Sequence, residues 1–581
     1  LRRGEKASTQ VWAIPVDGGE AHQVTSAPAT LIAYQWRPDG REIAYIYTDL
    51  STAREKSLKA KGYGFTYYEE DLKSRRLYAA PVNNGEAGEQ KALTGEGAVW
   101  EFIYSPDGKT IAASMSEKNL IDFRYAFNYI FSVDVASGQT KKISSNEGKL
   151  GNFEYSPDGK YLAYAAALNQ NDNAVSQAFV VPAGGGEAKN LTPENYRGHV
   201  TWVGWKDANT LAYLASEGVW DRLVNIPVKG GTRKSVFYSQ DLGFAPGTPS
   251  YTPGFKMAAF TGSNGSYPSE LFYWDGKKAT RLTNSNPELS STALGKQEVI
   301  RYKARDGQEI EGLLIYPVGY ESGKSYPLVV KVHGGPESHF PNRWVSRYSE
   351  PGQVLAGKGY LVFFPNYRSS TGYGVKFAMT GFNDAAGVEF DDIADGIDHL
   401  IATGLADKDR VGLGGGSYGG FASAWFSSYY TAKVRAVCMF VGISDLISKR
   451  GTTDIPYEEL FVHSGKKLEE MWEQSLKRSP IYYAHQSKTA VLIYGGEDDT
   501  RVHPSQSIEY YRRLKMNDHP AVRLVQYPGE QHGNRRQAGQ LDVMLRQLAW
   551  YDWYVRDLKP LDGPMPPLDL SDQYGLDLPK K

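Results

Sequence analysis

A repeated unit in the first half of the chain restricts the fold more than any other feature of the sequence. Each unit has a Pro-Asp-Gly-type turn and then a short apolar strand, with clear copies at 36–47, 104–114 and 155–165 and weaker ones at 205–215 and 251–260. Successive copies are spaced by 68, 51, 50 and 46 residues. A second motif, two short strands joined by a glycine turn, alternates with the first. A period of about 50 residues with roughly four strands per unit is typical of a β-propeller.

Five full units follow a half unit that has only its second hairpin. The sequence therefore predicts an all-β propeller domain over residues 1–290, incomplete at the chain start. The wide first spacing holds a strongly charged insertion, 51–76. Such runs usually lie on solvated loops or helices, which is the interpretation we favour. The alternative is a substrate-contacting arm, with Glu69 and Glu70 as candidate anchors for a peptide amino terminus.

The pattern changes near residue 297, where apolar strand runs begin to alternate with helical patterns such as 388–404 and 505–515. Strands that alternate with helices indicate βαβ units and a mostly parallel sheet. Near-continuous apolar strands fit a sheet that is covered on both faces. We therefore predict an α/β domain over residues 291–560 and a C-terminal tail over 561–581.

Ser417 stands in the pattern Gly-x-Ser-x-Gly, directly after a predicted strand and before a predicted helix. This strand–turn–helix context indicates the nucleophile elbow of an α/β-hydrolase, in which a tight turn pushes the serine hydroxyl out over the sheet edge. The helix N-terminus offers backbone N–H groups, that of Tyr418 among them, to a developing oxyanion. The bare pattern is weak because the chain has 61 glycines, and the context gives it its weight.

A serine nucleophile needs a histidine base and an acid that orients the base. In α/β-hydrolases they follow in the order serine, acid, histidine. A loop after one predicted strand offers Asp499, and a loop after the next offers His532. Catalytic groups of parallel sheets collect at such strand ends. The rivals are Asp498 for the acid, and His503 and His485 for the base.

The run His333-Gly334-Gly335-Pro336 follows another predicted strand. Its small residues let a backbone N–H approach a substrate carbonyl, as a second oxyanion donor beside the N–H of Tyr418. A Gly-Pro turn without chemistry is the alternative. The serine, acid and histidine elsewhere in the domain favour the functional interpretation.

Composition excludes several classes of protein. A formal net charge of -1 argues against a nucleic-acid binder, and no apolar run is long enough for a membrane helix. The single cysteine, Cys438, excludes intramolecular disulfides and cysteine-based zinc sites. The first residues do not form a signal peptide, and a removed signal or missing upstream chain stays open. Among compartments, we favour periplasmic or extracellular over cytoplasmic.

In these motifs the chain resembles the prolyl oligopeptidase family of serine peptidases. Within it, the similarity is to the acylaminoacyl-peptidase-like branch, which also holds bacterial dipeptidyl peptidases. The resemblance covers nearly the whole chain and implies a β-propeller that caps an α/β-hydrolase domain, with the site between them. The motifs that carry it are the Ser-Pro-Asp-Gly repeats, HGGP (333–336), NYRSSTGYG (366–374), GGSYGG (415–420), GEDDTRV (496–502) and PGEQHG (528–533).

The resemblance also implies roles for single residues. The family's acid stands three residues after the glycine of GEDDTRV, which selects Asp499 over Asp498. Arg501 corresponds to the side chain that holds the substrate's P2 carbonyl; its alternative is a surface ion pair with the acidic residues 497–499. The implied roles are Ser417 as nucleophile, Asp499 as acid, His532 as base, and Gly335 and Tyr418 as backbone oxyanion donors.

The leading hypothesis is a serine peptidase that acts on short peptides, with no metal or organic cofactor implied. The alternatives are a carboxylesterase or deacetylase with the same triad, and a non-catalytic propeller scaffold. The paired-glutamate anchor of the dipeptidyl peptidases has an aromatic context that YYEED (67–71) matches poorly. Acylated versus free amino termini, the P1 preference and homo-oligomer formation are left open.

Overall fold

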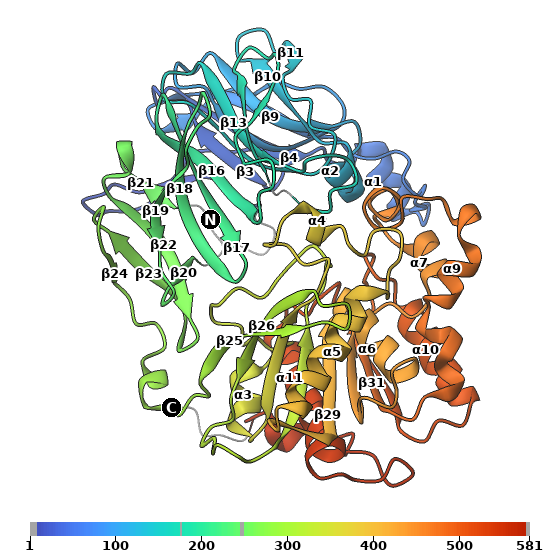
Figure 1. Ribbon diagram of the computed structural model, residues 1–581. Helices are drawn as coiled ribbons and strands as arrows, with labels where there is room; N and C mark the ends of the chain where they lie inside the picture. Colours follow the sequence, from blue (N-terminus) through green and yellow to red (C-terminus); the bar gives the residue numbers. More distant parts are fainter. Residues whose placement is uncertain (1–7, 175–176, 245–248, 577–581) are drawn as a thin grey trace.

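Small antiparallel sheets form the N-terminal half of the chain, in a computed structural model that describes residues 8–174, 177–244 and 249–576 (Figure 1). A two-stranded hairpin comes first, and antiparallel units of about four strands follow it. The first two of these units join through a parallel residue pair, Arg75 and Ala98, into a nine-stranded sheet. The order matches the half unit and full units that the repeats predict.

Within the described residues, the strands of this half are β1 (Trp12–Ala13), β2 (His22–Gln23), β3 (Ala33–Trp36), β4 (Glu42–Thr48), β5 (Arg75–Asn83), β6 (Glu86–Ala87), β7 (Lys91–Ala92), β8 (Ala98–Tyr104), β9 (Thr110–Ser116), β10 (Tyr129–Asp134), β11 (Thr140–Lys142), β12 (Leu150–Tyr155), β13 (Tyr161–Ala166), β14 (Gln177–Pro182), β15 (Lys189–Asn190), β16 (His199–Asp207), β17 (Thr210–Glu217), β18 (Trp220–Pro227), β19 (Lys234–Tyr238), β20 (Gly243–Phe244), β21 (Ser250–Tyr251), β22 (Ala258–Asn264), β23 (Tyr267–Trp274) and β24 (Ala279–Arg281).

The Ser-Pro-Asp-Gly repeats form the tight turns between the first two strands of a unit. In the turn between β8 and β9, the Ser105 hydroxyl donates to the Asp107 carboxylate at 2.7 Å, and Gly108 has a φ of 66°. Positive φ favours glycine, and the aspartate fixes the turn by hydrogen bonds to its own neighbours. The turn between β12 and β13 repeats this arrangement with Ser156 and Asp158. The repeated letters therefore encode a repeated turn.

The charged insertion forms the short helix α1 (Ala53–Ala60), which has no buried residue, and an exposed loop after it. A capping box between Thr52 and Glu55 starts this helix. The second helical insertion of the propeller, α2 (Ile121–Ala126), lies between β9 and β10 and contacts the C-terminal domain.

An eight-stranded mixed sheet forms the centre of the C-terminal domain. Its order is β25-β26-β28-β27-β29-β30-β31-β32, with antiparallel pairing at β25–β26–β28 and parallel pairing in the rest. The mostly parallel sheet that the alternating pattern predicts is therefore confirmed. Its strands are β25 (Gln297–Lys303), β26 (Glu309–Ile315), β27 (Tyr326–Val332), β28 (Leu361–Asn366), β29 (Ala406–Gly416), β30 (Ala436–Phe440), β31 (Ala490–Gly496) and β32 (Val522–Tyr527).

Helices cover both faces of this sheet (Figure 1). One hydrophobic core joins α5, α6 and α10 to the sheet, and a second core joins α3 and α11 to its other face. This two-sided burial explains why the central strands are apolar at nearly every position. The helices of the domain are α3 (Gly352–Gly357), α4 (Val375–Ala378), α5 (Val388–Ala402), α6 (Tyr418–Ser428), α7 (Leu446–Thr452), α8 (Pro456–Glu458), α9 (Trp472–Lys477), α10 (Ser505–Met516) and α11 (Gln537–Tyr551).

The two domains meet along the end of the sheet where β29 leads into α6 (Figure 1). The predicted fold, a β-propeller followed by an α/β-hydrolase domain, is confirmed. The last propeller strand ends at Arg281, and the first strand of the C-terminal domain begins at Gln297. Of the predicted tail, residues 561–576 are described and pack on this domain: the Tyr574 hydroxyl donates to Asp542, and Arg546 donates to the Leu568 carbonyl. Residues 577–581 lie outside the described residues.

Cys438 lies in β30, fully buried in the middle of the sheet, and burial raises the pKa of its thiol to about 12.

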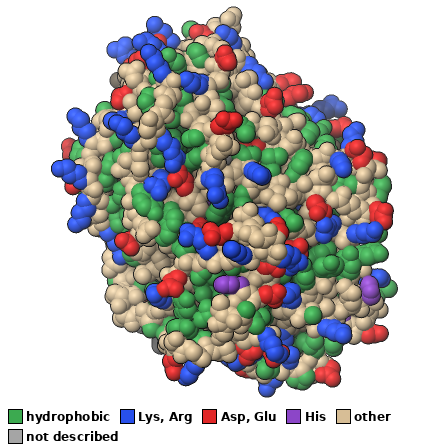
Figure 2. Space-filling view, viewed as in Figure 1, with side chains coloured by type: hydrophobic (Ala, Val, Ile, Leu, Met, Phe, Trp, Pro, Cys, Tyr) green, Lys and Arg blue, Asp and Glu red, His purple; other side chains and the backbone are tan. Residues whose placement is uncertain are grey.

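On the face drawn in Figure 2, positive and negative side chains are interspersed. Among the described residues, no helix is both long and apolar enough to span a membrane.

Candidate active site

Ser417 occupies the sharp turn between β29 and α6, with a φ of 59° and a ψ of -118°. Its backbone N–H donates to the Phe440 carbonyl at 3.0 Å, which ties the turn to the neighbouring strand. A Cβ atom on either Gly415 or Gly419 would lie 2.1 Å from the Val332 carbonyl oxygen. Both flanking glycines are therefore required by packing, as a nucleophile elbow demands.

His532 and Asp499 meet in the loops that follow β32 and β31. His532 Nδ1 lies 2.7 Å from Asp499 Oδ2. The other oxygen, Oδ1, accepts the backbone N–H groups of Arg501 at 2.9 Å and Val502 at 3.1 Å. Asp499 is only 2% exposed, so its carboxylate is fixed by three donors in a buried place. The acid–histidine geometry of a catalytic triad is thus present.

The rival residues lie elsewhere. Asp498 is exposed, and its backbone N–H donates to the Glu530 carbonyl. His503 is exposed and contacts Ser505, while His485 lies on the exposed side of a short helix.

Ser417 and His532 line one cavity of about 540 Å³ between the domains. Gly334 packs directly on the serine, since a Cβ there would lie 3.1 Å from Ser417 Cβ. Gly335 follows with a φ of 116°, and Tyr418 begins α6. Within the residues that the structure describes, neither the Gly335 nor the Tyr418 N–H donates to a protein acceptor. Both donors are therefore free for an oxyanion beside Ser417.

Comparison with known proteins agrees with this geometry. Residues 346–557 match the sequence profile of the Prolyl oligopeptidase family, Peptidase_S9. This part of the chain, which holds Ser417, Asp499 and His532, belongs to the prolyl oligopeptidase family.

Similar proteins extend the likeness to both domains. The Uncharacterized peptidase YuxL of Bacillus subtilis is 28% identical over 95% of this chain and 87% of its own length. Dipeptidyl-peptidase 5 of Porphyromonas gingivalis is 25% identical over 79% of this chain and 67% of its own. The solved structure of Pyrococcus horikoshii acylaminoacyl peptidase has a TM-score of 0.78 at 20% identity and covers 97% of this chain and 87% of its own.

The loop that carries Gly335 is held by side chains to which the sequence alone assigned no role. The Tyr367 hydroxyl donates to the His333 carbonyl at 2.7 Å, and His333 Nε2 lies 2.8 Å from the Ser370 hydroxyl. Burial lowers the pKa of His333 to about 4, so the ring is neutral. Tyr367 and Ser370 both belong to the motif NYRSSTGYG, which was the available signal.

Arg501 lines the cavity with its side chain a quarter exposed. Its Nε donates to Asp454 Oδ1 at 2.6 Å, and the guanidinium lies 5.5 Å from the centre of the Tyr125 ring. Burial lowers the pKa of Arg501, but the bond to Asp454 outweighs it, so the pKa is raised. The ion-pair partner is therefore Asp454, not the acidic residues 497–499 that the surface alternative invoked.

Glu69 and Glu70 lie in the exposed loop after α1, and neither lines the cavity. The structure thus does not bring them together with Ser417.

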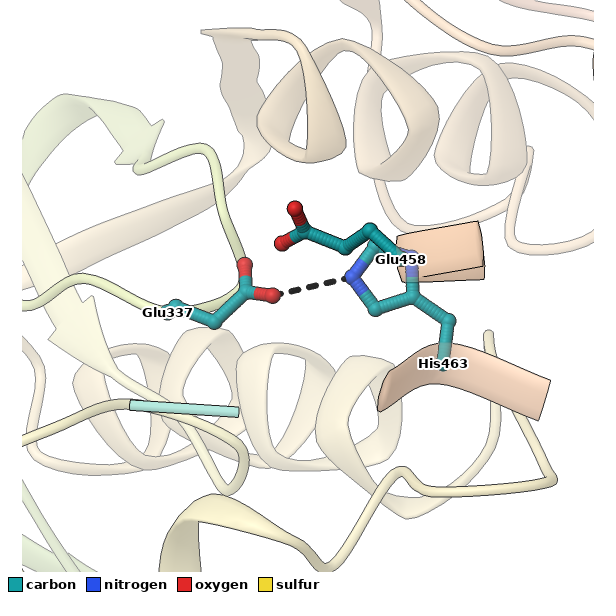
Figure 3. Close-up of side chains that lie close together, drawn as sticks. All are labelled: Glu337, Glu458 and His463. Carbon is teal, nitrogen blue, oxygen red and sulfur yellow. Dashed lines mark hydrogen bonds and ion pairs between the residues drawn. The ribbon is translucent and has the colours of Figure 1, made fainter. Parts of the chain in front are cut away.

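The cavity instead holds charged residues that the sequence analysis missed. Lys149, from the propeller, forms ion pairs with both Glu337 and Glu458. His463 contacts Glu337 and lies beside Glu458 (Figure 3). Glu337 directly follows HGGP and could have been found from that position. Glu458 and His463 lie in a segment, 456–464, whose letters carry no recognisable pattern. Glu459 and Lys449, which pair with each other, also line the cavity, as do Arg347 and Glu350.

Proposed function

We propose that this prolyl oligopeptidase family member hydrolyses short peptides through an acyl-enzyme at Ser417. The observation that supports this most is that the serine elbow and His532, whose Nδ1 is bound by Asp499, line one cavity. The three residues follow three strand ends, and Ser417 and His532 line the same cavity, which supports acyl transfer as the chemistry.

In the proposed mechanism, Ser417 Oγ attacks the scissile carbonyl while His532 Nε2 takes its proton. Asp499 receives the Nδ1–H of His532, which fixes the imidazole tautomer and stabilises the imidazolium. The N–H groups of Gly335 and Tyr418 bind the oxyanion. His532 then gives its proton to the leaving amine, and water, activated by the same histidine, releases the acyl group.

The position of the cavity supports small substrates. Its wall includes Tyr125 and Lys149 of the propeller, so the propeller covers the catalytic residues. A space of about 540 Å³ accommodates a few residues of an extended peptide and no folded domain. The names of two relatives, a dipeptidyl-peptidase and an acylaminoacyl peptidase, suggest release of short amino-terminal units.

Arg501 is proposed to hold a substrate carbonyl one residue before the scissile bond. Asp454 binds the guanidinium through Nε and Tyr125 contacts it, and the side chain still lines the cavity, where it can donate to a ligand. A charged hydrogen bond remote from the reacting atoms would align the peptide for attack.

The test combines a covalent probe with a substrate panel. A fluorophosphonate should label the wild type, and the Ser417→Ala variant should lose both labelling and peptide hydrolysis while it unfolds at the wild-type temperature. Removal of the nucleophile in such triads costs on the order of a millionfold in turnover. Residual activity of more than a few per cent would contradict the assignment. Hydrolysis of p-nitrophenyl esters without cleavage of any peptide in the panel would favour the esterase alternative instead.

A further inference from the structure

Two buried glutamates on the wall of the catalytic cavity already hold an ammonium group. Lys149 Nζ lies 2.5 Å from Glu458 Oε1 and 3.3 Å from Glu337 Oε1, and it donates to the Asn173 carbonyl at 3.2 Å. These three acceptors match the three N–H bonds of an ammonium. The glutamates belong to the C-terminal domain, whereas Lys149 comes from the propeller. The acceptors are therefore arranged as an ammonium group requires. The ammonium that they bind is that of Lys149, which reaches them from the other domain.

One oxygen of this site has no partner. Glu458 is 5% exposed, and its Oε2 is buried without a hydrogen bond to any of the described residues. A buried carboxylate oxygen without a donor is destabilising by about 1–3 kcal/mol or more and calls for an explanation. Both bonds of Glu337, from Lys149 and from His463, fall on its Oε1. The pair thus has more acceptor capacity than Lys149 uses.

The surrounding charges leave the pair negative. Burial raises the pKa of Glu337, but Lys149 and His463 outweigh it, so the carboxylate is ionised. Burial lowers the pKa of Lys149, but the two glutamates raise it by more, so the pKa is raised overall and the ammonium is charged. Glu459 binds Lys449 and His463 and does not pair with Lys149. Lys449 also lies near Glu458 and Glu337, whose charges act on its pKa, so the cluster sets three glutamates against two lysines and keeps an excess of acceptors.

A metal ion fits this place less well than an ammonium. Ligand atoms of Glu337, Glu458 and His463 lie within 4.8 Å of one another (Figure 3). However, His463 presents Nε2 to Glu337 and Nδ1 to Glu459, both at 3.0 Å, so neither nitrogen points a free lone pair into the group. The Lys149 ammonium would also repel a divalent cation at this distance.

We propose that Lys149 occupies the subsite for the α-ammonium group of a peptide substrate, and that free-amine peptides displace it when they bind. Glu337 and Glu458 are then the specificity-determining residues for an unblocked amino terminus. This inference rests on the proposed function. Lys149 is a long side chain, 18% exposed, that can turn towards solvent when another ammonium replaces it.

The position of the subsite fits a short amino-terminal unit. Glu337 comes two residues after Gly335, the proposed oxyanion donor, so their Cα atoms are at most about 7 Å apart. An ammonium held by Glu337 and Glu458 therefore belongs to a residue close before the scissile bond. The backbone N–H of Glu458 donates to Asp122 of α2 at 3.0 Å, so the propeller also fixes the position of this glutamate.

The kinetic test uses two dipeptidyl p-nitroanilides that differ only by an acetyl group on the amine. We expect the wild type to prefer the free amine at least tenfold in kcat/KM. Glu458→Gln should lower kcat/KM for the free amine about 10- to 100-fold, as loss of a charged hydrogen bond implies, and leave the acetylated substrate within twofold. Lys149→Met should change the preference in the opposite direction, because it removes the competing cation. The matched control is Glu473→Gln, at an exposed position of α9, which should change neither substrate.

A second test needs no hydrolysis. n-Butylammonium chloride should raise the unfolding temperature of Lys149→Ala by about 2 °C or more over sodium chloride at equal ionic strength. The wild type and the double variant Lys149→Ala/Glu458→Gln should not respond. If no peptide is cleaved by the wild type, the proposed function fails, and this measurement still decides whether the ammonium subsite exists.

Four results would overturn the inference. The wild type could cleave both substrates equally, or Glu458→Gln could lower both by one factor, which would make the glutamate structural. Lys149→Met could impair both substrates, which would make the lysine a tie between domains only. Calorimetric one-to-one binding of Zn²⁺ or Mn²⁺ that Glu458→Gln abolishes would assign the carboxylates to a metal.

Discussion

At the scale of single residues, a shift of one position in the loop after β31 separates the candidate catalytic acid from an exposed aspartate. Asp498 and Asp499 are neighbours, yet only Asp499 is buried and bound to His532. Asp499→Asn should lower kcat for peptides by roughly four orders of magnitude, because an amide in this place favours the wrong imidazole tautomer. Asp498→Asn should change kcat less than threefold. Steady-state kinetics of the two variants, with circular dichroism to check folding, measures both, and reversed effects would refute the assignment of the acid.

Arg501 gives a second prediction at this scale. Arg501→Ala should raise the barrier in kcat/KM for peptides by about 2–4 kcal/mol, since a charged hydrogen bond to substrate would be lost. Hydrolysis of a small p-nitrophenyl ester should hardly change, because that substrate has no P2 carbonyl. Asp454→Asn should shift the same ratio in the same direction by less, since it only loosens the guanidinium. An equal loss on both substrates would indicate damage to Asp499 instead.

At the scale of elements, a buried carboxylate links α5 to the start of α6. Glu389 accepts the Tyr418 hydroxyl at 2.9 Å and the backbone N–H groups of Ala386 and Gly387. Burial raises its pKa, the three hydrogen bonds lower it, and burial prevails, so the pKa is about 7. Tyr418, whose N–H is a proposed oxyanion donor, is thus anchored by the Glu389 carboxyl group, which has a pKa near neutral.

The raised pKa of Glu389 predicts a pH dependence of stability. The folded protein binds the proton more tightly than the unfolded chain, whose glutamate has a pKa near 4.5. The contribution is therefore complete below pH 4.5 and is lost as the pH rises to about 7, on the order of 3 kcal/mol in all. Urea unfolding of the wild type and Glu389→Gln across this range should show a difference that changes by this amount. A difference that stays constant with pH would contradict the prediction.

The elements that could be predicted from the sequence are those whose conformation requires particular residue types locally. The propeller turns need glycine and aspartate, and the elbow at Ser417 needs small neighbours, so both were visible in the sequence. Chain order indicated the two loops that carry the acid and His532, and the family resemblance selected Asp499 over Asp498. The segment 456–464 was not predicted, because Glu458 and His463 gain their positions from contacts with Lys149 and Asp122, far away in the chain. Only the docking of the domains creates that part of the cavity.

At the scale of the whole molecule, α2 ties the propeller to the C-terminal domain. The Asp122 carboxylate accepts the backbone N–H groups of Tyr457 and Glu458, at 2.7 and 3.0 Å. Around it, the rings of Phe123 and Phe127 pack edge-on against that of Tyr457. Asn171 adds a hydrogen bond to the Phe461 carbonyl at 2.7 Å. These contacts hold the wall of the cavity that carries Glu458.

Asp122→Ala should therefore weaken the docking of the domains near α8. Two buried N–H groups would lose their acceptor, at a cost of about 2 kcal/mol, and peptide kcat/KM should fall roughly tenfold or more. Limited proteolysis should cut the segment 454–466 faster than in the wild type. Asp241→Ala, at an exposed propeller position, is the control and should behave as wild type. Wild-type kinetics in Asp122→Ala would show that α2 does not shape the site.

The burial of Cys438 has a practical consequence for measuring how far the domains separate. Maleimide dyes react with the thiolate form of cysteine. The Cys438 thiol is buried and its pKa is raised, so we expect the folded native chain not to react with maleimides. Cysteines introduced at Ser137 of the propeller and Glu473 of α9, both exposed, would then take up a donor and an acceptor fluorophore without background. Energy transfer within single molecules would report opening and closing during turnover, with every native residue of the interior left in place.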